Sequence, residues 1–186
     1  MPYPAQVNRE TIIEKARALI EARGVDQLSL SVLAGELGIK APSLYHHFKN
    51  KTALLRAVNQ ATTAALVAAM NEAIEAADDT HSQITAMFHA YRAFAHQHPA
   101  TYGLVFTNTI AELRDDPQQA LQFALPLQAL MAKLVGEANS LAALRGAWAL
   151  LHGFVMLELA GQFRRGGDLD EAFQQVVDAY VRGWDK

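Results

Sequence analysis

Apolar residues recur with the spacing of an α-helix along almost the whole chain, and no stretch alternates long enough to make a strand. The first such stretch carries apolar side chains at Ile12, Ile13, Ala16, Leu19 and Ile20. Comparable stretches cover residues about 30–37, 41–47, 50–77, 81–97, 100–111, 117–135, 140–164 and 169–184. Turn signals such as Gly24, Pro99 and Asp78-Asp79 separate them, and Pro126 should kink or interrupt the helix that contains it. The pattern predicts an all-α fold of about nine helices.

The composition is that of a protein with a substantial core. Of the 186 residues, 51% are hydrophobic and 19% are charged, which argues against disorder. The absence of cysteine excludes disulfides, thiolate zinc sites and a cysteine nucleophile, and it suits a reducing cytosol. We see no signal peptide and no apolar run near the roughly 18 residues that span a bilayer. We therefore expect a cytoplasmic protein without a membrane partner.

The charge is distributed unevenly along the chain. Residues 1–60 hold 8 Lys and Arg against 5 Asp and Glu, a net charge of +3, whereas residues 61–186 hold 8 against 14, a net charge of −6. A basic first third on an acidic remainder indicates an anionic partner for that third alone. Chance scatter of surface charge is the alternative.

The stretch "GIKAPSLYHHFKNK" (residues 38–51) follows a short helical pattern and begins another. A glycine at position 38 allows a tight reversal, which is the layout of a helix-turn-helix. We expect Leu33 and Leu37 to meet Leu44 and Phe48 in a core, with the polar residues between them facing outward. His46 and His47 lie about 100° apart on a helix and cannot share a metal ion, so we expect no metal site.

The segment "LSLSVLAGELGIKAPSLYHHFKNKTALLRAV" resembles the DNA-binding segment of the tetracycline-repressor-like (TetR) transcriptional regulators. The order and spacing of the LAxxLGI core, the xLYxHFxxK run and the following ALL carry this resemblance. It implies a DNA-binding domain over residues 8–60, with the helix-turn-helix at about 29–48, and a helical ligand-binding and dimerisation domain over 61–186. It also implies a homodimer that places its third helix in a DNA major groove and responds to a small molecule.

Residue by residue, the resemblance implies DNA contacts along the helix-turn-helix and at the start of the next helix. These residues are Ser29, Ser31, Lys40, Ala41, Pro42, Ser43, Tyr45, His46, His47 and Lys51. Tyr45, His47 and Lys51 match phosphate-contacting positions, whereas Lys40, Ala41, Ser43 and His46 are candidates for reading base edges. The chain departs from the family at Lys40, where many relatives carry a Ser or Thr cap, and at Ser31, where arginine is common.

The C-terminal part is similar to a subgroup named for a Trp-His-Gly pattern, here Trp148, His152 and Gly153. Either these residues pack in the core or dimer interface, or His152 binds a ligand in an internal cavity. The ligand-binding candidates are Phe88, His89, Tyr102, Phe106, Trp148, His152 and Met156. The dimerisation candidates are Leu144, Leu151, Val155, Leu159, Phe173, Val177 and Tyr180, with the core of one subunit as their alternative role.

No phosphate-binding glycine loop, GxSxG elbow or HExxH motif is present, so we expect no enzyme and no cofactor. The sequence predicts a ligand-responsive transcriptional repressor that binds a pseudo-palindromic operator in double-stranded DNA as a homodimer. Its effector should be a mostly apolar small molecule. The alternatives are an activator of the same fold and a small-molecule-binding helical protein without a DNA function.

Overall fold

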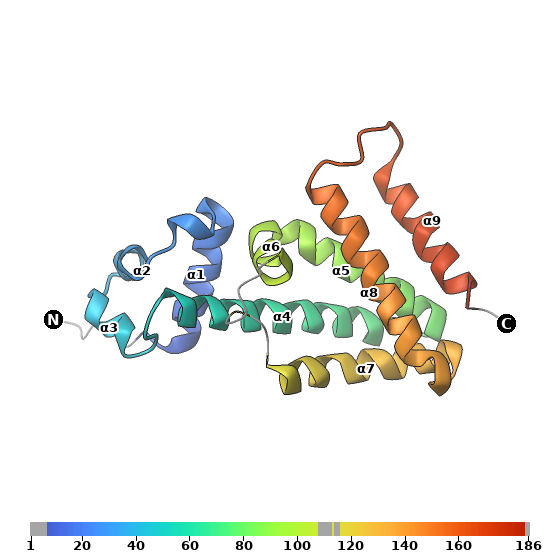
Figure 1. Ribbon diagram of the computed structural model, residues 1–186, viewed down its shortest axis with the longest axis horizontal. Coiled ribbons are helices and arrows are strands. Elements are labelled where there is room, and N and C mark those ends of the chain that lie inside the picture. Colours follow the sequence, from blue (N-terminus) through green and yellow to red (C-terminus); the bar gives the residue numbers. More distant parts are fainter. Residues whose placement is uncertain (1–6, 108–112, 114–115, 185–186) are drawn as a thin grey trace. The chain divides into compact units, whose positions relative to one another are not determined.

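The computed structural model describes residues 7–107, 113 and 116–184. Within these residues every regular element is a helix, which confirms the predicted all-α class. The elements are α1 (Arg9–Arg23), the short 3₁₀ helix η1 (Val25–Gln27), α2 (Leu30–Glu36), α3 (Ala41–Tyr45), α4 (Lys51–Glu75), α5 (Thr80–Gln97), α6 (Pro99–Thr107), α7 (Pro117–Val135), α8 (Glu137–Leu159) and α9 (Leu169–Arg182) (Figure 1).

The chain forms two compact units, one comprising Met1–Ala64 with His98–Asp115 and the other Ala65–Gln97 with Asp116–Lys186. The first break lies close to the predicted boundary at residue 60. The return of residues 98–115 to the first unit was not anticipated from the sequence. The helix α4 begins in the first unit and ends in the second.

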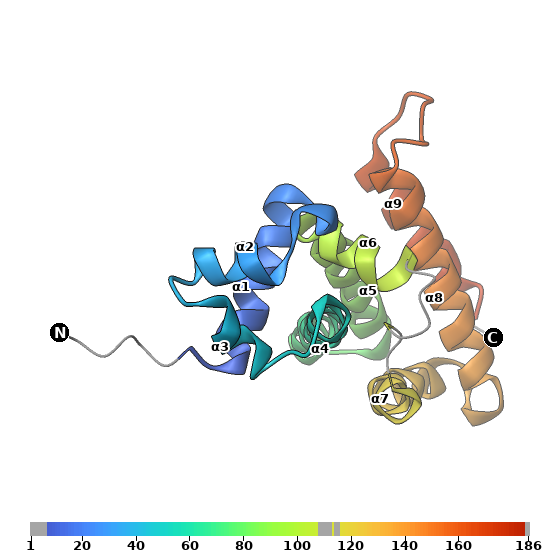
Figure 2. The same cartoon turned by 60° about the vertical axis from the view of Figure 1, so that its left-hand side comes forward.

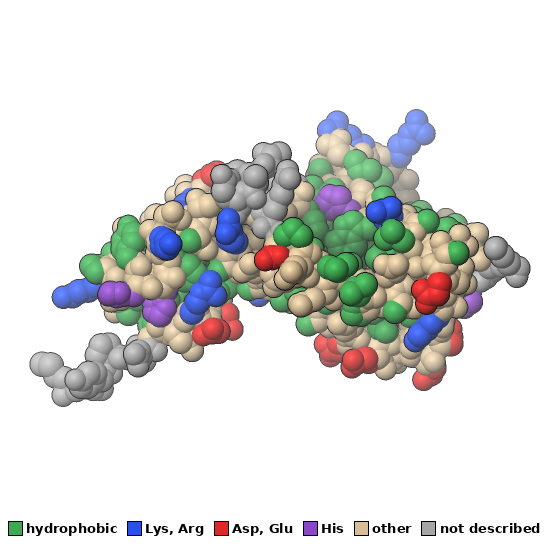
Figure 3. All heavy atoms as spheres, turned by 60° about the horizontal axis from the view of Figure 1, so that its bottom comes forward, with side chains coloured by type: hydrophobic (Ala, Val, Ile, Leu, Met, Phe, Trp, Pro, Cys, Tyr) green, Lys and Arg blue, Asp and Glu red, His purple; other side chains and the backbone are tan. Residues whose placement is uncertain are grey.

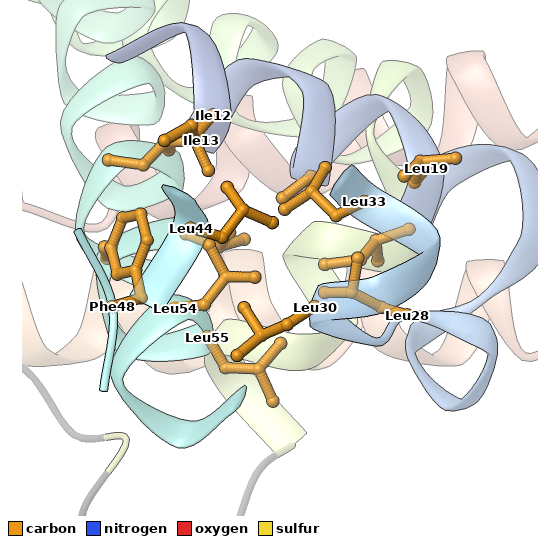
Figure 4. Close-up of a cluster of buried hydrophobic side chains, with 14 of the residues drawn as sticks. Ile12, Ile13, Leu19, Leu28, Leu30, Leu33, Leu44, Phe48, Leu54 and Leu55 are labelled. Carbon is orange, nitrogen blue, oxygen red and sulfur yellow. The ribbon is translucent and has the colours of Figure 1, made fainter. Parts of the chain in front are cut away.

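The core of the first unit is aliphatic and fully enclosed. Ile12 and Ile20 of α1, Leu33 of α2, Leu44 of α3 and Leu54 of α4 are each 0% exposed. Figure 4 shows these helices contributing side chains to one cluster. The cluster also contains Leu104 of α6 and Leu113, which explains why the later segment belongs to this unit. Burial of this many aliphatic groups is the main stabilisation of the unit.

The start of α6 is held by a side chain from α1. His98, the residue before this helix, is not one of the usual capping types, and Pro99 at the first position has no N–H to satisfy. The Glu21 carboxylate accepts hydrogen bonds from the backbone N–H groups of Ala100 (3.0 Å) and Thr101 (2.9 Å) and from the Thr101 hydroxyl (2.5 Å). A negative charge is favourable at a helix N-terminus, so Glu21 caps the start of α6 and joins α1 to α6.

The second unit is assembled from α5, α7, α8 and α9 together with the end of α4. Figures 1 and 2 both show α8 and α9 side by side, and the Tyr180 hydroxyl of α9 donates to the carbonyl oxygen of Ala143 in α8. Arg92 of α5 donates to both carboxylate oxygens of Glu158 in α8, at 2.9 and 2.5 Å. Long-range polar contacts of this kind fix the relative register of the helices.

Two sequence expectations are narrowed or corrected in this unit. The helix α7 runs through Pro126 without a break, so of the predicted kink or interruption the interruption is absent. By length and composition α8 is long and apolar enough to cross a membrane, contrary to the expectation that no run reaches that length. The core helix of a water-soluble protein meets the same criterion, and α8 buries Ser140, Ala143, Ala147, Leu151 and Val155.

Candidate nucleic-acid interface

The helix-turn-helix forms from local signals in the sequence. The Ser29 hydroxyl accepts a hydrogen bond from the Val32 N–H (3.1 Å) and begins α2. Gly38 then adopts a φ of 66°, a left-handed conformation that suits glycine and reverses the chain towards α3. Lys40 precedes α3 without a side-chain capping bond, which confirms the missing cap. Pro42 lies in the first turn, where its fixed φ favours the helix.

The short helix α3 separates buried from exposed residues as predicted. Leu44 (0% exposed) and Phe48 (2% exposed) point into the core. The helix is shorter than the predicted 41–47, because His46 forms its C-cap and His47 lies beyond it. The outward residues leave a continuous polar surface. Those classed as exposed are Lys40, Pro42, Ser43, Tyr45, His46 and His47.

Tyr45 stands out on this surface, because 55% of this large aromatic residue is exposed. Figure 3 shows histidine and basic side chains gathered over the same end of the first unit. Ser29 and Ser31 at the start of α2 are also exposed, whereas Ala41 is half-buried. The surface therefore combines hydroxyl, imidazole and ammonium donors around one aromatic ring, which suits a phosphate backbone and base edges.

The start of α4 lies directly after this surface. The Asn50 side chain accepts from the Ala53 N–H (2.8 Å), which confirms the predicted cap. Lys51 is half-buried, and its Nζ donates to the carbonyl oxygen of Val25 (2.9 Å). This bond ties α4 to the connection between α1 and α2. This bond uses one of the three ammonium hydrogens of Lys51. The contact between Lys51 and a DNA phosphate stays a prediction.

Glu36 at the end of α2 fixes that helix to α1. Its carboxylate pairs with Lys15 (3.1 Å) and Arg23 (2.9 Å). Hydrogen bonds from Lys15 and Arg23 lower the pKa of Glu36. The two cations of α1 are thereby partly neutralised, so they add little to the positive field of the first unit. No group of three or more His, Asp or Glu side chains in the described part of the chain is placed to hold a metal ion.

Comparison with known proteins agrees with this geometry. The profile described as "Bacterial regulatory proteins, tetR family" matches residues 12–58, and the profile "Tetracyclin repressor-like, C-terminal domain" matches residues 84–180. The HTH-type transcriptional regulator Rv0681 of Mycobacterium tuberculosis is 34% identical over 190 residues, covering 98% of this chain and 84% of the relative. The chain belongs to the TetR family. It is a helix-turn-helix transcriptional regulator.

Two further relatives show where the TetR-family likeness is concentrated. The class D tetracycline repressor of Escherichia coli is 48% identical, but only over 54 residues, or 29% of this chain and 25% of the repressor. A solved structure from Rhodococcus sp. RHA1, of unknown function, matches the whole of both chains with a TM-score of 0.80 and 27% identity. High identity to the class D repressor is thus confined to a short segment. The fold of the Rhodococcus structure, by contrast, is shared over the entire length of this chain.

The ligand-binding candidates of this TetR-family chain are divided between the units. Tyr102 and Phe106 contact each other in the first unit, with ring centroids 4.7 Å apart and the ring planes tilted by 49°. The other five belong to the second unit, namely Phe88, His89, Trp148, His152 and Met156. Phe88 is fully buried, the other four are half-buried, and burial lowers the pKa of His152. A buried neutral imidazole can both donate and accept a hydrogen bond.

Several of these candidates already have partners within the TetR-family chain. His89 shares a hydrogen bond with Gln174 (2.7 Å) and lies edge-on to Phe173, and Trp148 lies edge-on to Tyr91. These contacts fit the packing alternative for both residues.

Burial corrects the list of dimerisation candidates. Leu151, Val155, Phe173 and Val177 are at most 2% exposed in the single chain, so they form its own core. The apolar periodicity of α8 and α9 identified these positions, but it cannot tell an internal face from an intermolecular one. Leu144, Leu159 and Tyr180 are half-buried and keep some accessible surface.

The structure also contains a pocket that the sequence did not indicate. It has a volume of about 730 Å³ and lies in the second unit. Its walls come from the start of α5 and the residue before it, the end of α7, the start of α8 and the residues that follow α9. The lining residues are Asp79, Thr80, His81, Lys133, Leu134, Val135, Asn139 and Trp184. None of the predicted ligand-binding residues lines it, since no local pattern marks residues from four elements as neighbours.

Proposed function

We propose that this regulator binds a pseudo-palindromic DNA operator as a homodimer and represses transcription until a mostly apolar small molecule binds its second unit. One observation carries the proposal, the exposed polar face of α3 above the buried anchors Leu44 and Phe48. Because the anchors fix the helix, its outward donors are held in one arrangement, as sequence reading requires. We expect a regulator of this kind to act in the cytoplasm and without a cofactor.

Selection from a random duplex library with the purified full-length protein tests the proposal. We expect recovery of a pseudo-palindrome whose half-sites lie one or more helical turns apart, about 34–36 Å per turn. Ser43→Ala and His46→Ala should change the preferred sequence, whereas Lys51→Ala should weaken binding to all duplexes alike. Failure to enrich any site would support the alternative of a ligand-binding protein without a DNA function.

The homodimer should form through the outward faces of α8 and α9. Leu157 on α8 is 46% exposed although another face of the helix is buried, and Leu144, Leu159 and Tyr180 keep some accessible surface, so apolar surface remains for a second subunit. We expect Leu157→Glu to convert the dimer to a monomer in sedimentation equilibrium. The matched control is Leu121→Glu on α7, where the native leucine is 56% exposed. A monomeric native protein, or a dimer lost only in the control, would contradict this assignment.

The effector has two candidate locations, the region of Trp148 and His152 and the pocket bordered by Trp184. To distinguish the two locations, apolar small molecules are first screened for one that releases the protein from the selected duplex. Variants at each location are then tested for their response to that compound. We expect His152→Gln to weaken the response to that compound and to leave DNA affinity unchanged, because His152 supplies a polar group in an apolar setting. If Trp184→Leu alone weakens the response, the effector binds in the pocket. A compound that tightens DNA binding in a reporter strain would indicate an activator.

A further inference from the structure

Two helices of the first unit begin with the same pair of residue types, an asparagine followed by a cation. Asn8 precedes Arg9 in α1, and Asn50 precedes Lys51 in α4. Both asparagine side chains cap their helices, each accepting a backbone N–H at 2.8 Å. The two helix starts are therefore built alike, with a basic residue at the first helical position of each.

That position is electrostatically unfavourable for a cation. The N-terminus of a helix carries a partial positive charge, so a basic side chain there is repelled unless an electron-rich group compensates it. Lys51 has such a group in the carbonyl oxygen of Val25. Arg9 is exposed, and no carboxylate among the described residues forms an ion pair with it. Its compensation within the described chain comes from an aromatic ring.

The ring belongs to Phe48, and it ties Arg9 to the recognition helix. The guanidinium carbon of Arg9 lies 5.1 Å from the centroid of the Phe48 ring, a cation–π contact. Phe48 immediately follows His46 and His47, and its N–H donates to the carbonyl oxygen of Leu44 in α3 (2.9 Å). Figure 4 shows Phe48 at the end of the cluster that also holds Ile12 and Ile13 of α1. Arg9 is thus held beside the C-terminal end of α3.

We propose that Arg9 is a phosphate anchor for the DNA backbone that flanks the recognition helix. A guanidinium can stack one face on an aromatic ring while its N–H edge donates to two phosphate oxygens. Phe48 restricts the side chain before DNA arrives, so less conformational freedom is lost on binding. The inference rests on the proposed DNA-binding function and deepens it, since it adds a contact outside the helix-turn-helix and α4.

The competing explanation is that Arg9 only fastens α1 to α3 by its contact with Phe48. The salt dependence of DNA binding separates the two. Each phosphate contact contributes about 0.9 to the slope of log K against log salt concentration. A homodimer with both heads on DNA contains Arg9 twice, so Arg9→Gln should reduce the slope by about 1.8. At about 0.15 M salt the same loss corresponds to roughly 30-fold weaker binding. A purely structural arginine changes stability and leaves the slope unaltered.

The experiment compares the full-length protein with Arg9→Gln, Arg9→Lys and Arg164→Gln between about 50 and 200 mM salt. The probes are the duplex recovered by selection and a random-sequence duplex of equal length. Arg164 is the matched control, since it is an exposed arginine in the segment between α8 and α9. We expect the reduced slope for Arg9→Gln on both duplexes, an unchanged slope for Arg164→Gln, and a nearly native slope for Arg9→Lys, which keeps the charge.

The slope is independent of the fraction of active protein, so a partly destabilised variant still decides the question. A native slope for Arg9→Gln would overturn the phosphate role. So would an equal reduction in the Arg164→Gln control, which would show a general effect of charge. If the native protein binds neither duplex at any salt concentration, the proposed function itself fails, which is a separate outcome.

Discussion

The two compact units are stabilised by different kinds of contact. In the first unit, three helices begin with a side-chain cap. Asn8 caps α1, Ser29 caps α2 and Asn50 caps α4, and each accepts a hydrogen bond from the backbone N–H three residues later. In the second unit, the defining polar contacts join residues far apart in sequence. The Arg92–Glu158 pair spans 66 positions, and the His89–Gln174 bond spans 85. The difference is one of balance, because Asp116 and Asp168 cap α7 and α9 locally in the second unit, and Glu21 bonds residues 79 and 80 positions away in the first.

The cores differ in the same way. The first unit buries mainly isoleucine and leucine around α3. The second unit has aromatic pairs such as Phe88–Tyr180 and Phe154–Phe173. The first unit has the Tyr102–Phe106 pair, and both units place a guanidinium over a phenylalanine ring. An aliphatic core depends on volume and tolerates little loss, whereas a core with polar and aromatic contacts depends on geometry between specific partners. Substitutions can test whether this difference between the cores also appears in the free energy of unfolding.

Leu44→Ala should have the largest effect, because it removes a fully buried side chain from the first unit. We expect the free energy of unfolding to fall by about 3 kcal/mol, the usual cost of such a cavity. Urea unfolding followed by circular dichroism measures it. The control is Val32→Ala on α2, where the valine is 39% exposed and the loss should stay below about 1 kcal/mol. Equal losses in the two variants would mean that the aliphatic core does not dominate this unit.

Glu158→Gln tests the distant pair in the second unit. The Glu158 side chain is 7% exposed and that of Arg92 is 13% exposed, so loss of the carboxylate leaves a nearly buried guanidinium with only the exposed Asp170 as an ionic partner. We expect a loss of about 2 kcal/mol at neutral pH. The surface pair Arg182–Asp178, at 3.9 Å, provides the control: Arg182→Gln, at a side chain 72% exposed, should cost no more than about 0.5 kcal/mol.

The difference between native protein and Glu158→Gln should also depend on pH. Hydrogen bonding from Arg92 lowers the pKa of Glu158 below its ordinary value of 4.5. A lowered pKa means that the folded state favours the ionised carboxylate. Its stabilisation is therefore complete above the ordinary pKa and is lost as the pH falls through the lowered one. A difference that grows on acidification would show that the pair is not stabilising.

The contrast between the units explains how much the sequence could predict. The caps at Ser29 and Asn50, the turn at Gly38 and the buried Leu44 and Phe48 all follow from spacing within a few residues. For the same reason the polar face of α3 could be identified in advance. The DNA roles of its individual residues still rest on the family resemblance.

The remaining features depend on contacts that no local pattern encodes. Burial of Val155 and Phe173 within one chain, rather than in a dimer interface, is decided by the packing of α8 and α9. The pocket beside Trp184 arises only when four elements meet. The place of Lys51 in the motif predicts a DNA contact. Its bond to the carbonyl oxygen of Val25 can be known only from the path of the chain between α1 and α2. Each case needs tertiary structure before the residue's surroundings are known.

Glu21→Ala tests a distant polar contact of the first unit, the one that joins α1 to the start of α6. It removes the acceptor of three hydrogen bonds at the start of α6, and we expect a loss of about 1 kcal/mol. Hydrogen exchange at the N–H groups of Ala100 and Thr101 should accelerate, because local opening of α6 becomes easier. Glu14→Ala, an exposed acid of α1, is the control and should leave both amides unchanged. Unaltered exchange in the Glu21 variant would show that apolar packing, such as that of Leu104 and Tyr102, holds α6 without this carboxylate.

The titration of His152 should have the smallest effect on stability. It reports how polar the surroundings of this ring are in the second unit. Burial lowers the pKa of this imidazole from its ordinary 6.5, so the folded state favours the neutral ring. Stability should accordingly decline as the pH falls below 6.5 and level off below the lowered pKa, where both states bind the proton. Nuclear magnetic resonance titration of the His152 ring, assigned with His152→Gln, measures the midpoint. A midpoint at or above 6.5 would mean that burial does not disfavour the charged ring, and it would contradict the apolar setting proposed for His152.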